Sequence, residues 1–172
     1  DTSRLRGGIA ISSANIPFID RIEISTGKVM TVENKTAFQR MDEANFSYLY
    51  LGGYANRHQL AFLKKVIEDN PEWKYVHFGD IDACGFLINK NLCQATGKQF
   101  ELHCMGIPEL ENEKFAIARK PLTSNDVRRL HTLLEKEEYR HTIEYMLANN
   151  CKMEQEIVSL FFCRRYQYVS II

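Results

Sequence analysis

The order of strand-like and helix-like segments predicts an α/β fold: a mostly parallel four-stranded sheet in the order 2-1-3-4, with a helical C-terminal part. Three observations support this prediction. Strand-like and helix-like segments alternate over residues 28–105 with short connections, as in parallel sheets. Glu33 and Asp80 directly follow the first and third strand-like segments, and they meet only if those strands are neighbours. After Pro108 the alternation stops.

The first strand is predicted over residues 28–32, directly after the turn at Thr26-Gly27. Because asparagine and threonine side chains accept hydrogen bonds from free backbone N–H groups, Asn34 or Thr36 is expected to cap a helix. That helix should run to about Asp42. The first strand therefore leads directly into a helix.

The second strand is predicted over residues 46–51, which are rich in aromatic and β-favouring side chains. A turn at residues 52–56 leads into a helix that stops at Asn70-Pro71, since proline cannot continue a helix. One face of this helix carries apolar residues at helical spacing. They are Leu60, Leu63, Val66 and Ile67.

The third strand is predicted over residues 73–79. A helix should begin after Asp82 and end near Thr96, where Gly97 can adopt the left-handed conformation of a C-terminal cap. The fourth strand is predicted over residues 100–105. These segments complete the expected sheet.

The chain is expected to form one domain in three parts. Residues 1–26 are an N-terminal extension or edge hairpin with short strands at 9–11 and 18–24, or the tail of an upstream domain. Residues 27–107 form the α/β core, and residues 108–172 form a helical part of the same domain. A length of 172 residues is enough for one hydrophobic core.

The C-terminal part reads as a connection followed by helices. Residues 108–122 are predicted to be loop-like. The polar cluster at 123–126 can cap a first helix, and further helices are expected at 139–148 and from 153 to about 162.

Composition narrows the function classes. Apolar residues make up 45% and charged residues 26%, as in soluble globular domains, and the formal net charge is zero. A neutral domain gives no overall attraction for nucleic acid, so any such surface must be local. The five cysteines are odd in number and form no Cys-x-x-Cys pair, which favours free thiols in a reducing cytosol. With no apolar run of transmembrane length and no secretory signal, we expect a cytoplasmic protein, and the start at Asp1 suggests an excised domain.

Asp80 and Asp82 are separated by one residue at the end of the third strand. In extended backbone such residues point the same way, and a divalent cation relieves the repulsion between their charges. Glu33 follows the first strand, so three carboxylates are expected to converge. Ligand sets made only of oxygen favour Mg²⁺ or Mn²⁺, and such a centre suits phosphoryl transfer.

Each acid also has a structural interpretation. Glu33 can stabilise the following helix through the helix dipole. Asp80 and Asp82 can cap the helix that follows them, and an Asp-x-Asp pair alone is common in solvated loops. Glu154 and Glu156 either complete the acidic site or only dock the last helix.

Three basic residues are candidates for contacts with a phosphate-bearing substrate. Lys35 follows the first strand, and a solvated lysine is its alternative. Arg57 and His58 open the second helix on the side of the expected crevice. Structural hydrogen bonding is the alternative for this pair, and His58 can also be a packing residue. His77 is expected to be a core histidine.

Four segments carry a resemblance to a known family. Residues 32–38, 53–62, 77–86 and 153–156 read VENKTAF, GYANRHQLAF, HFGDIDACGF and MEQE. In this order they resemble the Toprim domain of JetD, the nuclease subunit of Wadjet plasmid-defence systems, over roughly residues 25–160. They are more distantly similar to the A subunit of topoisomerase VI and its meiotic relatives. The resemblance to JetD is favoured because Gly52-Gly53 replaces the basic turn of those relatives, and Ala55 stands where they usually carry proline.

The resemblance implies a Toprim (Rossmann-like) fold, Mg²⁺ bound by Glu33, Asp80 and Asp82, and cleavage of double-stranded DNA. It also implies a homodimeric full-length protein that works with an SMC-type motor complex and no membrane. An isolated neutral domain is expected to be inactive or weakly active. Two alternatives remain open: a DNA transesterase like topoisomerase VI, and a Toprim scaffold without catalysis. The transesterase places its nucleophilic tyrosine in a preceding winged-helix domain, for which this chain has no room.

Overall fold

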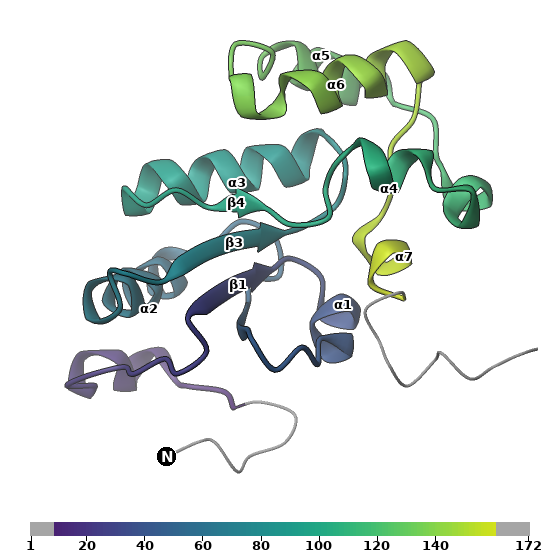
Figure 1. The fold of residues 1–172 in the computed structure, drawn as a ribbon. Helices are drawn as coiled ribbons and strands as arrows, with labels where there is room; N and C mark the ends of the chain where they lie inside the picture. Colours follow the sequence, from purple (N-terminus) through teal and green to yellow (C-terminus); the bar gives the residue numbers. More distant parts are fainter. Residues whose placement is uncertain (1–8, 161–172) are drawn as a thin grey trace, which may run out of the picture.

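The computed structural model describes residues 9–160 of the chain. Its sheet has four strands, all parallel, in the order β2-β1-β3-β4. They are β1 (Lys28–Val32), β2 (Ser47–Tyr50), β3 (Lys74–Phe78) and β4 (Glu101–Leu102). The predicted fold class and strand order are confirmed (Figure 1).

The fourth strand is shorter than predicted. Only Glu101 and Leu102 pair with β3, whereas residues 100–105 were expected to be extended. Cys104 has a positive φ of 51°, so the backbone turns away from the sheet directly after this pairing.

Helices cover both faces of the sheet. On one face, α2 (Arg57–Asp69) and α3 (Ala83–Thr96) pack on Val29 and Tyr75. On the other face, Met30 belongs to a second apolar cluster that includes residues of α1 (Lys35–Arg40) and of the C-terminal helices. Neighbouring residues of one strand thus enter different clusters, as the alternation of side chains along a strand requires.

The expected helix ends are confirmed. The Asn34 side chain accepts from the backbone N–H of Thr36 and begins α1. Asn56 begins α2 through a reciprocal capping box with Gln59. Gly97 ends α3 with a φ of 72°.

The N-terminal segment forms no strand between residues 9 and 26, so the short strands predicted at 9–11 and 18–24 are wrong. A 3₁₀ helix, η1 (Ser13–Phe18), stands between them. The N–H groups of Ile22 and Ile24 donate to the side chains of Asp69 and Asn70 instead of to a strand. Side chains at the end of α2 therefore satisfy backbone groups that a hairpin would have paired.

Residues 108–122 are largely helical, which corrects the loop predicted there. Pro108 lies in the first turn of α4 (Ile107–Glu111), where its missing N–H has no helical partner to lose. The Asn112 side chain then accepts from Lys114 N and begins the 3₁₀ helix η2 (Glu113–Ala118). The alternation of strands and helices does stop at Pro108, as expected, but short helices rather than a loop follow it.

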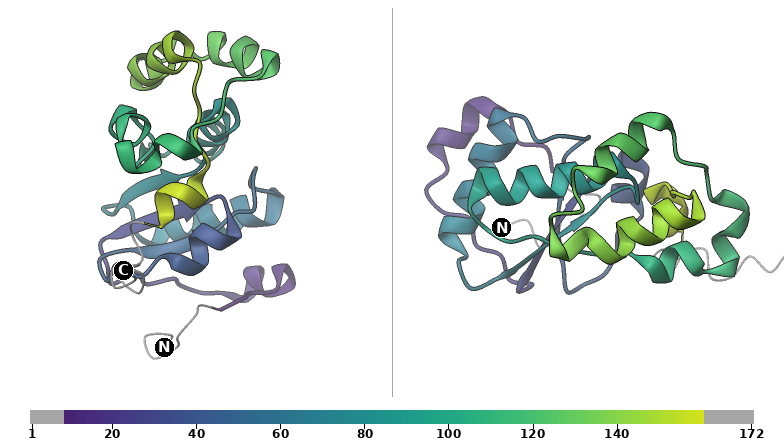
Figure 2. Two further views of the ribbon diagram at one scale, coloured as in Figure 1. Left: turned by 90° about the vertical axis from the view of Figure 1, so that its right-hand side faces the viewer. Right: turned by 90° about the horizontal axis from the view of Figure 1, so that it is seen from above.

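The remaining chain forms a helical layer and then returns to the sheet. Beyond α3 lie α5 (Ser124–His131) and α6 (Glu137–Asn149), from which residues 150–160, here called the C-terminal arm, run back to α1 (Figures 1 and 2). The arm pairs with Ile81 through Met153 and ends in α7 (Gln155–Ser159). The helix predicted to about residue 162 therefore begins two residues later, and its predicted end lies outside the described residues.

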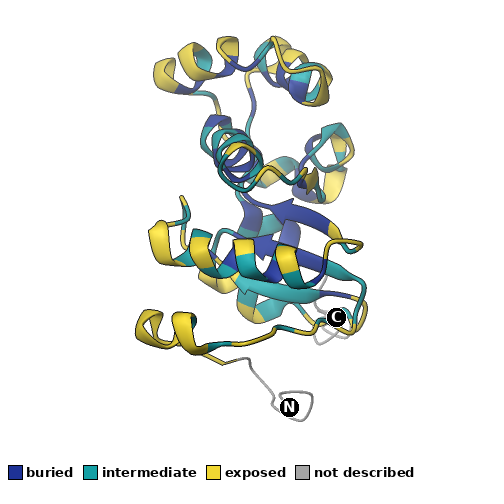
Figure 3. Ribbon diagram, turned by 90° about the vertical axis from the view of Figure 1, so that its left-hand side faces the viewer, coloured by how far each residue is buried: buried dark blue, intermediate teal, exposed yellow. Residues whose placement is uncertain are grey.

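Buried residues concentrate in the strands and on the inner faces of the helices (Figure 3). The four cysteines within residues 9–160 are free thiols. None of the helices in this range is long and apolar enough to cross a membrane.

Candidate functional site

The ends of β1 and β3 place Glu33 next to Asp80. Val32 pairs with Phe78 in the parallel register, so the residues that follow both strands emerge side by side. Glu33 N donates to Phe78 O (3.1 Å), and Asp80 N donates to Glu33 Oε2 (3.3 Å). The expected meeting of the first and third strand ends is thus confirmed in the backbone.

Two glycines of the segment around the acids permit this close approach. A Cβ on Gly79 would lie 2.7 Å from Glu33 Oε2 and 2.8 Å from His77 Nε2. A Cβ on Gly85 would lie 2.1 Å from the carbonyl oxygen of Asp80. Because the contact at position 85 is with backbone, Gly85 is required there, whereas a side chain at position 79 would displace the side chains of Glu33 and His77.

His77 is a core residue, as expected. It is fully buried, burial lowers its pKa to about 3, and its Nδ1 lies 2.9 Å from Thr31 Oγ1. Thr31 Oγ1 also lies 3.2 Å from Val76 O, an acceptor only, so the hydroxyl donates there and accepts from His77 Nδ1. The Nε2 of the neutral imidazole lies beside Gly79 and has no hydrogen-bond partner within residues 9–160.

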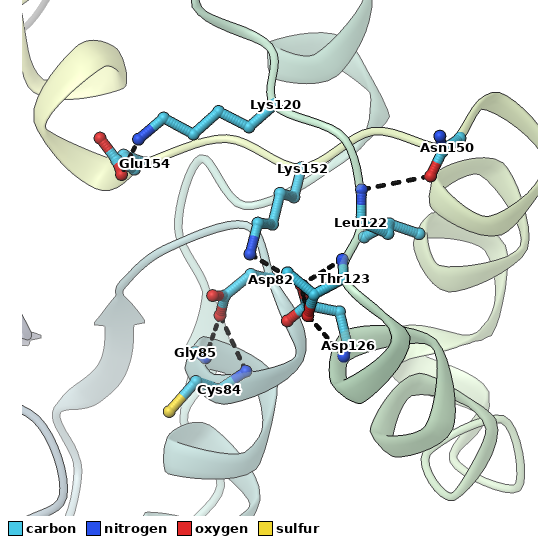
Figure 4. A network of polar contacts seen from close by, with 10 residues as sticks. All are labelled: Asp82, Cys84, Gly85, Lys120, Leu122, Thr123, Asp126, Asn150, Lys152 and Glu154. Atoms are coloured by element: carbon cyan, nitrogen blue, oxygen red, sulfur yellow. Dashed lines mark hydrogen bonds and ion pairs between the residues drawn. The ribbon is translucent and has the colours of Figure 1, made fainter.

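Asp82 is the N-cap of α3. Its Oδ1 accepts from Cys84 N (2.8 Å) and from Gly85 N (2.9 Å) (Figure 4). The capping interpretation is confirmed for this one oxygen. Asp80 is not a cap, because its Oδ1 accepts from Gln155 N in the C-terminal arm (2.7 Å).

The three acids Glu33, Asp80 and Asp82, here called the carboxylate cluster, share one electrostatic environment. Burial raises the pKa of Glu33 to about 7, and the charges of Asp80, Asp82 and Glu156 add to the rise. Burial likewise raises the pKa of Asp80 to about 6, with Asp82, Glu156 and Glu154 contributing. Single backbone N–H groups from Asp80 and Gln155 oppose these rises and do not cancel them.

The donor set of the cluster fits a hard divalent cation. Each carboxylate has one oxygen that accepts from backbone N–H, and no hydrogen bond within residues 9–160 engages the other oxygen. Oxygen atoms of this kind are the ligands that Mg²⁺ and Mn²⁺ prefer. The cluster is not preassembled, since no group of three His, Cys, Asp or Glu side chains in this range is arranged to hold a metal ion.

Of the three basic candidates Lys35, Arg57 and His58, Lys35 alone lines a pocket with acids of the cluster. Lys35 lines an open pocket of ≈ 360 Å³ together with Glu33 and Asp80. Arg57 and His58 are exposed and do not line that pocket, and Arg57 Nε donates to His58 Nε2 (3.1 Å). The structural hydrogen bond predicted as the alternative for this pair is present. The prediction that His58 is a packing residue is wrong, because its side chain is exposed.

Glu154 and Glu156 dock the arm and also lie near the cluster. Glu154 forms an ion pair with Lys120, and Glu156 accepts from the side-chain amide of Asn34. Both acids also raise the pKa of Asp80. The two interpretations of this pair are therefore compatible.

Two further residues lie at the site that the sequence analysis did not single out. Lys152 lies beside Asp82 and binds Asp126 with Nζ 2.7 Å from Oδ2 (Figure 4). Tyr54 is half-exposed; burial raises its pKa, and Glu33 and Asp82 add to the rise. Neither residue belongs to a periodic pattern or to the acidic spacing, so only the fold brings them to the cluster.

Comparison with known proteins identifies the family of the chain. Among curated proteins no match to the chain is found. A family described as "Wadjet protein JetD, C-terminal" matches residues 2–166. The match spans nearly all of the 172 residues, and the chain belongs to this JetD C-terminal family.

Proposed function

We propose that the chain is a Toprim nuclease domain that cleaves double-stranded DNA with Mg²⁺ or Mn²⁺. The observation that carries this proposal is the carboxylate cluster at the adjoining ends of β1 and β3, with one oxygen of each acid left for a ligand. Ligands bind at this edge of open α/β sheets, where the strand order reverses. Membership of the JetD C-terminal family supports a role in Wadjet defence.

Glu33, Asp80 and Asp82 are the proposed metal ligands. A bound Mg²⁺ would polarise a phosphate oxygen and stabilise the leaving oxygen. Because the three acids are not grouped for an ion as they stand within the described chain, binding would require their side chains to rotate inward. The alternative role of Glu33 is that of general base rather than ligand, which a pKa raised to about 7 by burial in the metal-free protein would suit.

Contacts with DNA are proposed for Lys35, Arg57 and His58. Lys35 is exposed and reaches the same pocket as the acids, where it can meet a phosphate. Arg57 and His58 extend the positive surface at the start of α2. Since the net charge is zero and phosphate contacts supply most non-specific affinity, we propose that the isolated domain is inactive or weakly active. We propose that the full-length protein is a homodimer that works with an SMC-type motor complex, and that these partners supply the remaining affinity for DNA.

Plasmid cleavage by the full-length protein, assembled with its motor complex, tests the proposal. Mg²⁺ should support the production of linear DNA, EDTA should stop it, and Glu33→Gln should abolish it. Lys64→Gln, a change on α2 outside the pocket, is the matched control and should leave cleavage intact. Cleavage that persists in EDTA would overturn metal dependence.

A DNA transesterase is the second candidate, and Tyr54 is the observation that favours it. This half-exposed phenol lies near Glu33 and Asp82, where a covalent link to DNA could form. Denaturing gels of reactions stopped in detergent should show no protein–DNA adduct if the nuclease proposal is correct. An adduct that is lost in Tyr54→Phe would favour the transesterase.

A scaffold without catalysis is the third candidate, favoured by the absence of a preassembled metal group within residues 9–160. Titration with Mn²⁺ separates it from the nuclease. Stoichiometric binding that Asp80→Asn removes supports the nuclease, whereas no binding at millimolar Mn²⁺ supports the scaffold.

A further inference from the structure

Gln155 is the point where the C-terminal arm meets the carboxylate cluster. It is fully buried, although glutamine is a mostly exposed residue type. Its backbone N–H donates to Asp80 Oδ1 at 2.7 Å. This bond joins the arm directly to a proposed metal ligand that stands 75 positions earlier in the chain.

The side-chain amide of Gln155 bridges the two strand ends that carry the acids. Its Nε2 donates to Phe78 O (2.8 Å), and its Oε1 accepts from Asn34 N (2.8 Å). Phe78 stands two residues before Asp80, and Asn34 directly follows Glu33. One side chain therefore fixes the spacing between the segments that carry two of the three acids.

An amide is the group that these two partners require. The carbonyl of Phe78 accepts a second bond beside that from Glu33 N, and the N–H of Asn34 needs an acceptor, so a glutamine in one orientation serves both. An apolar side chain of the same length serves neither: Asn34 N loses its acceptor, and Phe78 O loses the bond from the amide and keeps that from Glu33 N. Arg40 holds the arm from the outer side, because its Nη1 donates to Glu156 O (2.8 Å) and to Ser159 Oγ (3.0 Å).

We propose that Gln155 is a positioning residue for the metal centre. It holds Asp80 through the backbone and the ends of β1 and β3 through the amide, so that the segments carrying Glu33 and Asp80 keep the spacing from which both side chains could turn toward one ion. It contributes no ligand itself. This inference rests on the proposed metal-dependent function. If it holds, the helical C-terminal part completes a site whose proposed ligands all lie in the α/β core, residues 27–107.

Gln155→Met tests the role because methionine keeps the length and removes both amide bonds. The matched control is Asn89→Leu. Asn89 is also fully buried, and its amide also joins two partners, donating to Phe100 O (2.9 Å) and accepting from Tyr139 Oη (2.6 Å). Neither partner belongs to the site, so a merely structural effect should be the same in both variants.

Electron paramagnetic resonance measures the affinity for Mn²⁺. Plasmid cleavage is measured over a range of Mn²⁺ concentrations with the full-length protein and its motor complex. We expect Gln155→Met to weaken Mn²⁺ binding by about tenfold, as is typical when a partner that orients a ligand is removed. Excess Mn²⁺ should restore cleavage in Gln155→Met, because all three ligands remain, and should not restore it in Asp80→Asn. Asn89→Leu should bind Mn²⁺ as wild type does.

Urea unfolding in EDTA identifies variants that fail to fold. If Gln155→Met is unfolded, Arg40→Met replaces it, and a weaker loss of Mn²⁺ affinity in the same direction is expected. Unchanged Mn²⁺ affinity in these variants, or an equal loss in Asn89→Leu, would overturn the positioning role. A wild-type protein that binds no Mn²⁺ would instead overturn the proposed function, so the two failures are distinguishable.

Discussion

Two acidic regions meet the C-terminal arm, and they differ in how their charges are balanced. Asp126, in the first turn of α5, accepts from Thr123 N (2.9 Å), Thr123 Oγ1 (2.7 Å) and Lys152 Nζ (2.7 Å). Burial alone would raise its pKa, but the hydrogen bonds from Lys152 and Thr123 hold the pKa of Asp126 below its usual value. The charge of Asp126 therefore stabilises the fold.

The carboxylate cluster shows the opposite balance. Glu33 accepts one long bond from Asp80 N, and Asp80 accepts one bond from Gln155 N. Burial and the neighbouring acids raise the pKa of both. No ion pair reaches either acid within residues 9–160.

The difference separates structural acids from candidate functional acids. A fold that can surround Asp126 with three donors could equally have placed a lysine against Asp80. Titratable groups left under-compensated in this way cluster at functional sites. The comparison predicts that the two regions respond in opposite directions to the same substitutions.

The largest expected difference is in DNA cleavage. Asp80→Asn in the full-length protein with its motor complex should lower the rate of plasmid cleavage by at least about 100-fold, because loss of a ligand should exceed the 10–100-fold typical of outer partners. Asp126→Asn should leave the rate within about twofold. The assay measures linear product at saturating Mg²⁺. Equal rates in Asp80→Asn and wild type would remove Asp80 from the catalytic site.

Metal binding should stabilise only proteins with an intact cluster. A ligand that binds the native state alone adds about 2.7 kcal/mol to the free energy of unfolding at a hundredfold excess over Kd. We expect this gain in wild type and Asp126→Asn, and no gain in Asp80→Asn. Thermal unfolding with and without Mn²⁺ measures it. A gain of the same size in all three proteins would indicate a metal site elsewhere.

The pH dependence of metal-free stability should follow the cluster. The ordinary pKa of Glu33 is 4.5, and burial in the fold raises it to about 7. The ordinary pKa of Asp80 is 3.8, and burial in the fold raises it to about 6. Between these values the folded state retains protons that the unfolded state has lost, so stability is greater at low pH and falls as pH rises. One pKa unit corresponds to about 1.4 kcal/mol, so the two shifts together set an upper bound of about 4 kcal/mol from about pH 5 to 8. Because solvent screens these partly exposed groups, we expect a fall of about 2 kcal/mol.

Urea unfolding in EDTA at a series of pH values measures this fall. Glu33→Gln should remove most of the slope, because the variant has no proton to lose at this position. Asp126→Asn should leave the slope in place, since the low pKa of Asp126 lies outside the interval. Stability that rises over the same interval would contradict the assigned directions.

Asp126→Asn should destabilise the metal-free protein by about 1–2 kcal/mol. The change weakens hydrogen bonds to a charged acceptor and leaves Lys152 without its partner. Asp80→Asn should leave stability unchanged or raise it by about 0–1 kcal/mol, because it relieves repulsion. Urea midpoints in EDTA at neutral pH compare the two. A larger loss in Asp80→Asn than in Asp126→Asn would reverse the comparison.

The sheet and the ends of its helices could be predicted from the sequence because their signals are local. Asn34, Asn56 and Gly97 act within a few residues of their positions, and the strand order followed from acids at two strand ends. The 3₁₀ helix Ser13–Phe18 was missed because the chain before β1 is fixed by distant side chains, such as that of Asp69. Long-range polar contacts of this kind leave no periodic pattern.

The same reason limits the prediction of the site. Asp80 and Asp82 could be proposed because their spacing has a direct geometric meaning in extended backbone. Gln155 bonds to Asn34 across 121 positions, and the Lys152 pair with Asp126 joins the C-terminal arm to the first turn of α5. Only the folded arrangement shows that Gln155 contacts Asp80 and the ends of β1 and β3.

The smallest expected effect on stability concerns Asp82, which is both a helix cap and a member of the carboxylate cluster. Its Oδ1 caps α3, and loss of a cap costs about 1 kcal/mol. Its charge also raises the pKa of Glu33 and of Asp80, so its removal relieves repulsion of similar size. Asp82→Ala should therefore change the metal-free free energy of unfolding by only about 0–1 kcal/mol while abolishing plasmid cleavage. The control Thr123→Ala removes a cap from α5 without relieving repulsion in the cluster, and should cost the full ~1 kcal/mol. Retained cleavage in Asp82→Ala would remove this residue from the metal site, and a stability loss equal to that of Thr123→Ala would show that it acts only as a cap.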